Sequence, residues 1–257
     1  MRMIRSLAVT SILLAVLTAS LCMADTLKTM PIELGKAKIV AYDKSTGSLR
    51  WQCTLSTIKT NFNGKPFYYT EENGKGNFGN NNSYKTWKVM GYYQISASGV
   101  TPYEVKQTMK DAGGKTVLSL DKSYNAKEGK IVCDVNGSAK VFDFNKNTID
   151  KDLLGRVLTN FPFETGGDVN FYLMTHEPAL YNITMKNRGK ETITLKGRSI
   201  ECYKIELVPD LGALSLLGAF VPKTYFWYTT STPHKFMRYE GLESGLGTPV
   251  IIMESGD

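Results

Sequence analysis

Residues 210–254 read DLGALSLLGAFVPKTYFWYTTSTPHKFMRYEGLESGLGTPVIIME. An apolar segment opens this stretch, and three strand-like segments follow at residues 225–228, 235–240 and 250–253. Residues 225–228 carry aromatic side chains on both faces, so neither face of that strand is expected to be fully exposed to solvent. Pro and Gly residues separate the segments, which is typical of turns between antiparallel strands. The stretch therefore predicts strands whose apolar faces need partners from the upstream chain.

The upstream chain continues this alternating pattern. In residues 49–58, Leu49, Trp51 and Cys53 share one face, and turn signals recur about every ten residues. Residues 71–83 are rich in Asn and Gly and predict a surface loop, and Arg188-Gly189 predicts a turn. The pattern as a whole predicts a mainly β fold with a single strongly curved antiparallel meander sheet, as in an open or half barrel.

Two segments interrupt the strand pattern. Asp150 is suited to cap a helix, and Pro162 ends a run of apolar residues at helical spacing: Leu153, Leu154, Val157, Leu158 and Phe161. This predicts one amphipathic helix near residues 150–161 that packs on the sheet. A second, short apolar helical segment is expected near residues 210–218, where glycines make a poor free helix. Residues 210–220 could form a lid over a hydrophobic cavity or could fill the core, and both alternatives stay open.

The N-terminus has the features of a signal peptide. Arg2 and Arg5 precede an uncharged apolar run at residues 6–21, and cleavage is expected after Ala24. A membrane anchor or a lipid attached at Cys22 are the alternatives. Residues 1–24 are therefore assigned to a signal peptide and residues 25–257 to a single β-rich domain, with a periplasmic location and no transmembrane segment after cleavage.

The charge and cysteine content limit the classes of partner. Loss of Arg2 and Arg5 with the signal peptide would lower the net charge from +7 to +5, and the remaining charges are scattered. No nucleic-acid partner is expected, because a basic stripe with interleaved aromatic residues is absent. Strand alternation places Cys53 and Cys133 towards the core and Cys202 away from it. Buried free thiols are expected, with a Cys53–Cys133 disulfide as the alternative.

The sequence lacks the usual signatures of a catalytic or metal site. His176-Glu177 lacks the second histidine of an H-E-x-x-H motif, and His234 lies in a turn that is expected to face solvent. No G-x-S-x-G motif occurs. Glu240 and Glu243 are expected to be exposed rather than to form a glycosidase pair. We therefore expect no catalytic residue, no metal, no cofactor and no enzymatic activity.

Four segments resemble a known group of proteins: CYKIELVPDLG at residues 202–212, VPKTYFWY at 221–228, PHKFMRYEG at 233–241 and GLGTPVII at 245–252. They are similar to the C-terminal half of exported Gram-negative bacterial proteins classified under a domain of unknown function. The resemblance covers residues 145–254 well and the N-terminal half loosely. It implies a curved antiparallel sheet similar to the open-barrel lipid and lipoprotein carriers of the envelope, and it implies no chemistry.

Two hypotheses on function follow. The first is a non-catalytic periplasmic protein that binds or carries a hydrophobic ligand, such as a lipid or an acyl chain, in the cavity of the curved sheet. It predicts a cavity lined by Phe161, Phe171, Leu173, Leu214, Leu217, Phe220, Tyr225 and Trp227. The second is a structural or protein-interaction component of the cell envelope with a filled core. The sequence names neither the ligand, nor an envelope protein partner, nor the oligomeric state.

Overall fold

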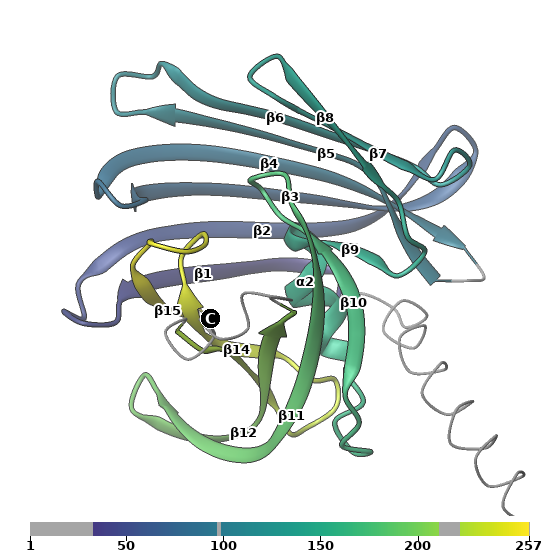
Figure 1. The fold of residues 1–257 in the computed structure, drawn as a ribbon. Helices are drawn as coiled ribbons and strands as arrows, with labels where there is room; N and C mark the ends of the chain where they lie inside the picture. The colour runs from purple at the N-terminus through teal and green to yellow at the C-terminus, as the bar shows by residue number, and fades with distance from the viewer. Residues whose placement is uncertain (1–32, 97–98, 211–221, 257) are drawn as a thin grey trace, which may run out of the picture.

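The computed structural model describes residues 33–96, 99–210 and 222–256. One antiparallel sheet dominates the structure, which confirms the mainly β fold and its strong curvature. In Figure 1, β2–β8 form one wall, β10–β15 bend round beneath it, and the single labelled helix lies between them. The predicted signal peptide lies outside the described residues, as do residues 211–221 of the apolar segment.

The strands alternate with short turns over the whole chain. The N-terminal strands are β1 (Gly35–Asp43), β2 (Leu49–Phe62), β3 (Lys65–Phe78), β4 (Ser83–Ser96), β5 (Gly99–Asp111), β6 (Thr116–Asn125), β7 (Lys130–Val135) and β8 (Ser138–Asp143). The C-terminal strands are β9 (Thr148–Asp150), β10 (Val169–Met174), β11 (Leu180–Leu195), β12 (Arg198–Pro209), β13 (Thr224–Thr229), β14 (Phe236–Leu242) and β15 (Val250–Ser255). The last three coincide with the strands predicted from residues 225–253.

The strand order explains how the two ends of the chain are joined. The order is β8-β7-β6-β5-β4-β3-β2-β1-β15-β14-β13-β12-β11-β10-β9, so β1 pairs with both β2 and β15. Ala41, for example, lies opposite Trp51 on one side and Met253 on the other. β9 and β10 pair in parallel, and the other neighbours are antiparallel. Because β8 and β9 form the two edges and do not pair with each other, the sheet is an open barrel.

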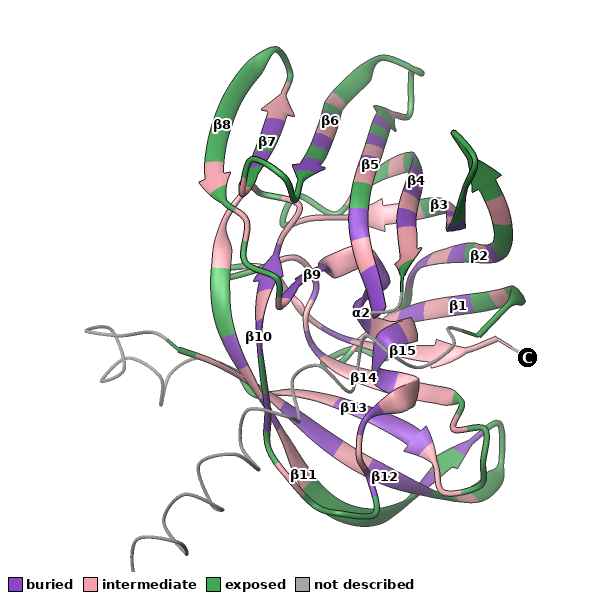
Figure 2. Cartoon of the chain, turned by 90° about the vertical axis from the view of Figure 1, so that its right-hand side faces the viewer, coloured by how far each residue is buried: buried purple, intermediate pink, exposed green. Residues whose placement is uncertain are grey.

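The predicted helix is confirmed. α2 (Lys151–Val157) continues into a 3₁₀ turn, η1 (Leu158–Asn160), and the Asp150 side chain accepts a hydrogen bond of 2.9 Å from the Asp152 amide. Its apolar residues are buried in the main core, on the inner face of the sheet. Figure 2 shows buried residues along α2 and on the strands that surround it, whereas the hairpin tips are exposed. We call the face of the sheet that surrounds α2 the inner face.

The loop predicted at residues 71–83 is wrong over most of its length. β3 continues to Phe78, and only a short turn separates it from β4. The glycines in this segment serve packing, because a Cβ on Gly74 would lie 2.0 Å from the Trp87 ring. A glycine in a strand beneath an aromatic ring is a known way to let the ring lie flat on the sheet.

The turn predicted at Arg188-Gly189 is also wrong. These residues form an irregularity within the long strand β11, where the register with β12 shifts between Asn187 and Lys190. A bulge bends a strand and increases its twist. The tip of the β11–β12 hairpin reaches β14, where Arg238 donates a hydrogen bond of 2.9 Å to the Thr194 carbonyl.

Candidate functional site: the inner face of the sheet

The inner face carries one apolar side chain from each of five neighbouring strands. Strand pairing places Gly74 opposite both Cys53 and Trp87, and Met109 opposite both Trp87 and Leu118. Phe78 and Trp51 lie next to Trp87, with ring centroids 5.5 and 5.6 Å from it. We call the set Trp51, Phe78, Trp87, Met109 and Leu118 the apolar stripe. Phe78 and Leu118 are half-buried, so the stripe is partly open at these two positions.

A second row of side chains, which is polar, crosses the same strands. Along β2 it lies four residues beyond Cys53, on the inner face. Thr57 lies opposite Thr70, and the row continues through Gly91 and Val105 to Lys122. The Tyr93 ring lies over Gly91, and a Cβ at this position would clash with the ring at 2.6 Å. The inner face therefore changes along the strand direction from apolar and aromatic to polar and charged.

Glu72 lies where these two regions meet. It is opposite Leu55 and Val89, and its Oε1 accepts a hydrogen bond of 2.5 Å from Trp87 Nε1. Burial raises the pKa of Glu72, and the Trp87 hydrogen bond opposes this only in part. The carboxyl therefore takes up a proton more readily than an exposed glutamate does.

Charged side chains gather where α2 begins. Lys122 Nζ lies 2.6 Å from Asp150 Oδ2 and 3.8 Å from Asp152 Oδ2, and the side chains of Lys122 and Asp150 are both 0% exposed. The Tyr124 hydroxyl donates to Asp150, and His176 Nε2 lies 2.5 Å from Asp152 Oδ1. We call Lys122, Tyr124, Asp150, Asp152 and His176 the inner charge cluster.

The pKa shifts in the inner charge cluster follow from burial and from the neighbouring charges. Burial alone would lower the pKa of Lys122, but the two aspartates raise it above its ordinary value. The pKa of Asp150 is raised, because the cost of burial exceeds the attraction of Lys122. Burial also acts to raise the pKa of Asp152, but His176 and Lys122 hold it below its ordinary value. Lys122 and Asp150 are enclosed and paired, so a substrate could not reach them.

The eight residues predicted to line a cavity do not form one surface. Phe161, Phe171 and Leu173 are buried in the main core with α2. Tyr225 and Trp227 belong to a second cluster with Ile193 and Cys202, because they point to the opposite side of β13 from Phe226 and Tyr228. The remaining three residues, Leu214, Leu217 and Phe220, lie outside the described residues. Sequence patterns detected the aromatic strand but could not tell which of its faces meets the main core.

The histidines and cysteines have ordinary structural roles. His234 is half-buried, where its Nδ1 contacts the Thr229 carbonyl at 2.7 Å and its ring packs on Phe163, so the prediction that it faces solvent is wrong. Cys53, Cys133 and Cys202 are buried free thiols, including Cys202, which the alternation had placed away from the core. Within residues 33–96, 99–210 and 222–256, no three His, Cys, Asp or Glu side chains are placed to hold a metal ion.

Glu243 is buried, which corrects the expectation that it is exposed. Its Oε1 accepts hydrogen bonds from Arg50 Nε and Trp51 Nε1, both at 2.9 Å. Its Oε2 accepts from Arg50 Nη2 at 3.1 Å and from the Gly79 amide at 2.7 Å. We call Arg50 and Glu243 the rim pair. The rim pair connects the β14–β15 turn to β2 and to the β3–β4 turn. Each oxygen of its carboxylate accepts two hydrogen bonds.

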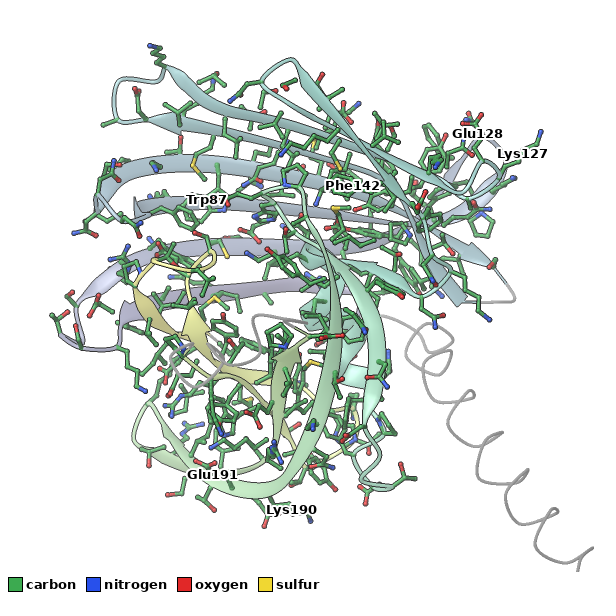
Figure 3. All side chains as sticks on the ribbon, in the orientation of Figure 1. Trp87, Lys127, Glu128, Phe142, Lys190 and Glu191 are labelled. Atoms are coloured by element: carbon green, nitrogen blue, oxygen red, sulfur yellow. The ribbon has the colours of Figure 1, made fainter. Side chains whose placement is uncertain are left out.

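Two further features lie away from the inner charge cluster. A shallow groove of about 250 Å³ beside the rim pair is bounded by Arg50, Trp51, Gly76 and Tyr84, among others, and is smaller than a typical small-molecule pocket. An aromatic cluster covers the far ends of β2–β5, and we call it the outer aromatic patch: Ile58, Phe62, Phe67, Tyr69, Tyr92 and Tyr103. Figure 3 shows Trp87 among the side chains that fill the enclosed space, whereas Lys127, Glu128, Lys190 and Glu191 lie at the periphery.

No helix in the described part of the chain has the length and apolar character needed to cross a membrane. The chain matches no protein-family model and no curated protein. Among solved structures it is similar to a β-barrel-like protein of a domain of unknown function, DUF1849, from Brucella abortus. The two chains are 7% identical, with a TM-score of 0.49 over 86% of this chain and 94% of that chain.

Proposed function

We propose that the protein is a non-catalytic periplasmic binding protein that holds a hydrophobic ligand, such as a lipid or an acyl chain, against the inner face of its sheet. The observation that carries this proposal is the apolar stripe, to which each of the strands β2–β6 contributes one side chain. The open barrel supports it, because β8 and β9 at its two edges are not joined by strand pairing.

Binding would draw its free energy from apolar surface removed from water. Each CH₂ group of a buried acyl chain contributes about 0.8 kcal/mol. Trp51, Phe78 and Trp87 pack edge-on or tilted against one another and present a rigid surface to the chain. No reaction is assigned, since Lys122 and Asp150 of the inner charge cluster are enclosed and paired.

A neutral fluorescent probe, N-phenyl-1-naphthylamine, tests the proposal without involving charge. We expect saturable fluorescence enhancement with the wild-type protein and a loss of affinity of at least tenfold in Leu118→Asp. Val117→Asp is the matched control, because Val117 is the preceding residue and its side chain is 41% exposed. Equal probe binding by the folded Leu118→Asp and Val117→Asp proteins would reject the apolar stripe as the site.

Native mass spectrometry then identifies the natural ligand. Protein purified gently from the periplasm is expected to carry a stoichiometric extra mass that organic solvent extracts as a lipid. A bare protein mass, together with no uptake of the probe, would reject ligand binding altogether.

The second candidate function is a structural or protein-interaction component of the cell envelope with a filled core. The outer aromatic patch favours it, because Ile58, Phe62 and Tyr103 are exposed and clustered aromatic surface is typical of protein interfaces. A Phe62→Ser, Tyr103→Ser double variant tests this alternative. It is expected to lose a specific envelope protein in crosslinking if the patch is an interface, and an unchanged crosslinking pattern would reject the patch as one.

A further inference from the structure

Arg156, in the last turn of α2, has hydrogen-bonding capacity that the described residues leave unused. Its Nη1 donates to the Glu33 carbonyl at 3.2 Å. Its Nε and Nη2 are buried and have no hydrogen-bond partner in the described part of the chain. Buried guanidinium nitrogens without an acceptor are costly, because these N–H groups have lost water and gained no hydrogen bond in exchange.

The surroundings of Arg156 form a polar site rather than an apolar one. Glu33, Tyr93, Glu72 and Cys53 are the groups that act on its charge, so the guanidinium lies close to β2, β3 and β4 on the inner face. Thr57, in the polar row, also has a buried hydroxyl oxygen without a partner. Unpaired buried polar groups are rare in native proteins, and several at one place indicate a site for something that the chain does not supply.

The acidic side chains nearby are already engaged. Asp150 pairs with Lys122 and Tyr124, and Asp152 contacts His176. Glu72 accepts from the Trp87 indole and takes up a proton readily, so it is a poor counterion for Arg156. Burial also lowers the pKa of Arg156, but a guanidinium remains charged at neutral pH. Glu33 is the carboxylate whose charge acts most strongly on Arg156, but it is exposed, and within the described residues only its backbone carbonyl is hydrogen-bonded to the guanidinium. Nε and Nη2 of Arg156 are therefore open to an anion from outside the chain.

The apolar stripe lies close enough to share a ligand with this cation. Thr57, at the polar row, and Trp51, in the stripe, are six residues apart on β2, which corresponds to about 20 Å along the strand. Glu72 and Trp87 lie between these two ends. An extended long-chain acyl group spans this distance.

We propose that the ligand is a single-chain carboxylate amphiphile, a long-chain fatty acid, whose carboxylate pairs with Arg156 while its chain lies along the apolar stripe. This inference rests on the proposed function and names its ligand class. A guanidinium donates two parallel hydrogen bonds to a carboxylate, and Nε with Nη2 is one of the edges that make such a pair. The Thr57 hydroxyl is a further donor on the polar row.

Competition against the neutral probe tests the inference with two ligands that differ only in the head group. Tetradecanoate and tetradecanol are titrated against N-phenyl-1-naphthylamine bound to the full-length mature protein at pH 8. In the wild type we expect tetradecanoate to bind about tenfold more tightly than tetradecanol, since a charge-assisted pair contributes that much. In Arg156→Met we expect the acid to lose this advantage and the alcohol to bind as before. Arg198→Met, at an exposed arginine on β12, is the matched control and is expected to alter neither affinity.

The outcomes separate the inference from the proposed function. If acid and alcohol displace the probe equally from the wild type, the carboxylate site is wrong while the apolar site stands. If the acid keeps its full advantage in folded Arg156→Met, Arg156 is not the partner and the inference is overturned. If the probe itself does not bind, the proposed function fails and the inference fails with it. Should Arg156→Met not fold, the wild-type comparison and the charge-conserving Arg156→Lys variant decide the question.

Discussion

Two arginines of this protein lie in opposite electrostatic situations. Arg50 and Glu243 form a closed pair at the rim, with side chains only 6% and 0% exposed, and each carboxylate oxygen accepts two hydrogen bonds. Arg156, in the last turn of α2, has two buried nitrogens without a hydrogen-bond partner in the described part of the chain. Both are buried cations of the same chemistry, but only one has a complete set of partners.

The difference separates structural groups from functional ones. A buried ion pair whose donors and acceptors are all satisfied is stable only as a unit. Removal of one partner should therefore lower the free energy of unfolding of the whole protein. A buried cation with unsatisfied nitrogens destabilises the protein that holds it, and such groups persist where a ligand completes them. The following predictions, in order of decreasing effect, test whether this distinction holds.

The largest effect is expected at the rim pair. Glu243→Ala leaves the Arg50 guanidinium buried without its carboxylate and takes the acceptor from Trp51 Nε1, so the free energy of unfolding should fall by about 3–5 kcal/mol. Urea unfolding measures this. Glu240→Ala is the control, because Glu240 pairs with the exposed Lys44 and should cost about 1 kcal/mol or less. If Glu243→Ala lowers the free energy of unfolding as little as Glu240→Ala does, the rim pair does not stabilise the β14–β15 turn.

The next largest effect is expected at Lys122. Lys122→Met leaves Asp150 and Asp152 as neighbouring buried carboxylates, and the free energy of unfolding should fall by about 3 kcal/mol at pH 7. Without Lys122, the pKa of Asp150 should rise further. A carboxyl with a raised folded-state pKa destabilises the fold as pH rises through that value, so the loss should shrink as pH is lowered.

Unfolding of the wild type and Lys122→Met at pH 7 and pH 5 measures this dependence. The difference in unfolding free energy between the two proteins should be smaller at pH 5 than at pH 7. An equal difference at both values would mean that Asp150 does not titrate in this range once Lys122 is removed.

Much of the fold could be predicted from the sequence because the signals are local. The alternation that places Trp51 and Cys53 on one face and the helix cap at Asp150 depend on neighbouring residues, and the structure confirms both. Leu49, predicted on the same face, is instead exposed, because the register shifts next to it. The errors arose where partners distant in the sequence determine the outcome. Gly74 belongs to a strand only because Trp87 of the next strand lies on it, and no pattern within residues 71–83 shows this.

The candidate site was harder to predict for the same reason. Glu72 fell in the predicted loop, and the apolar spacing that predicted the helix does not involve Arg156. One signal was available: Leu118, Leu120, Lys122 and Tyr124 alternate on one face of a single strand, so a lysine at the third of these positions had to be buried. Such a lysine requires an acidic partner, and Asp150 at the helix cap was a candidate.

A smaller effect is expected at Glu72, and it depends on pH. Because burial raises the pKa of Glu72 above its ordinary value of 4.5, its ionisation destabilises the fold as pH rises from there through the folded-state value. Glu72→Gln removes this titration and keeps an acceptor for Trp87 Nε1. The variant should therefore lose less stability than the wild type as pH increases. Parallel curves of unfolding free energy against pH would contradict the raised pKa.

The smallest effect on stability is expected at Arg156, and it is the most informative. Arg156→Met keeps an unbranched apolar stem and removes a buried charge with two unsatisfied nitrogens, so the free energy of unfolding of the ligand-free protein should change by about 1 kcal/mol or less, in either direction. Urea unfolding of delipidated protein measures it beside Glu243→Ala. A loss as large as that at Glu243 would mean that Arg156 is already paired within the chain, and the contrast between the two arginines would disappear. A near-zero change, combined with lost affinity for a fatty acid, would show that the protein keeps this arginine for its ligand rather than for its fold.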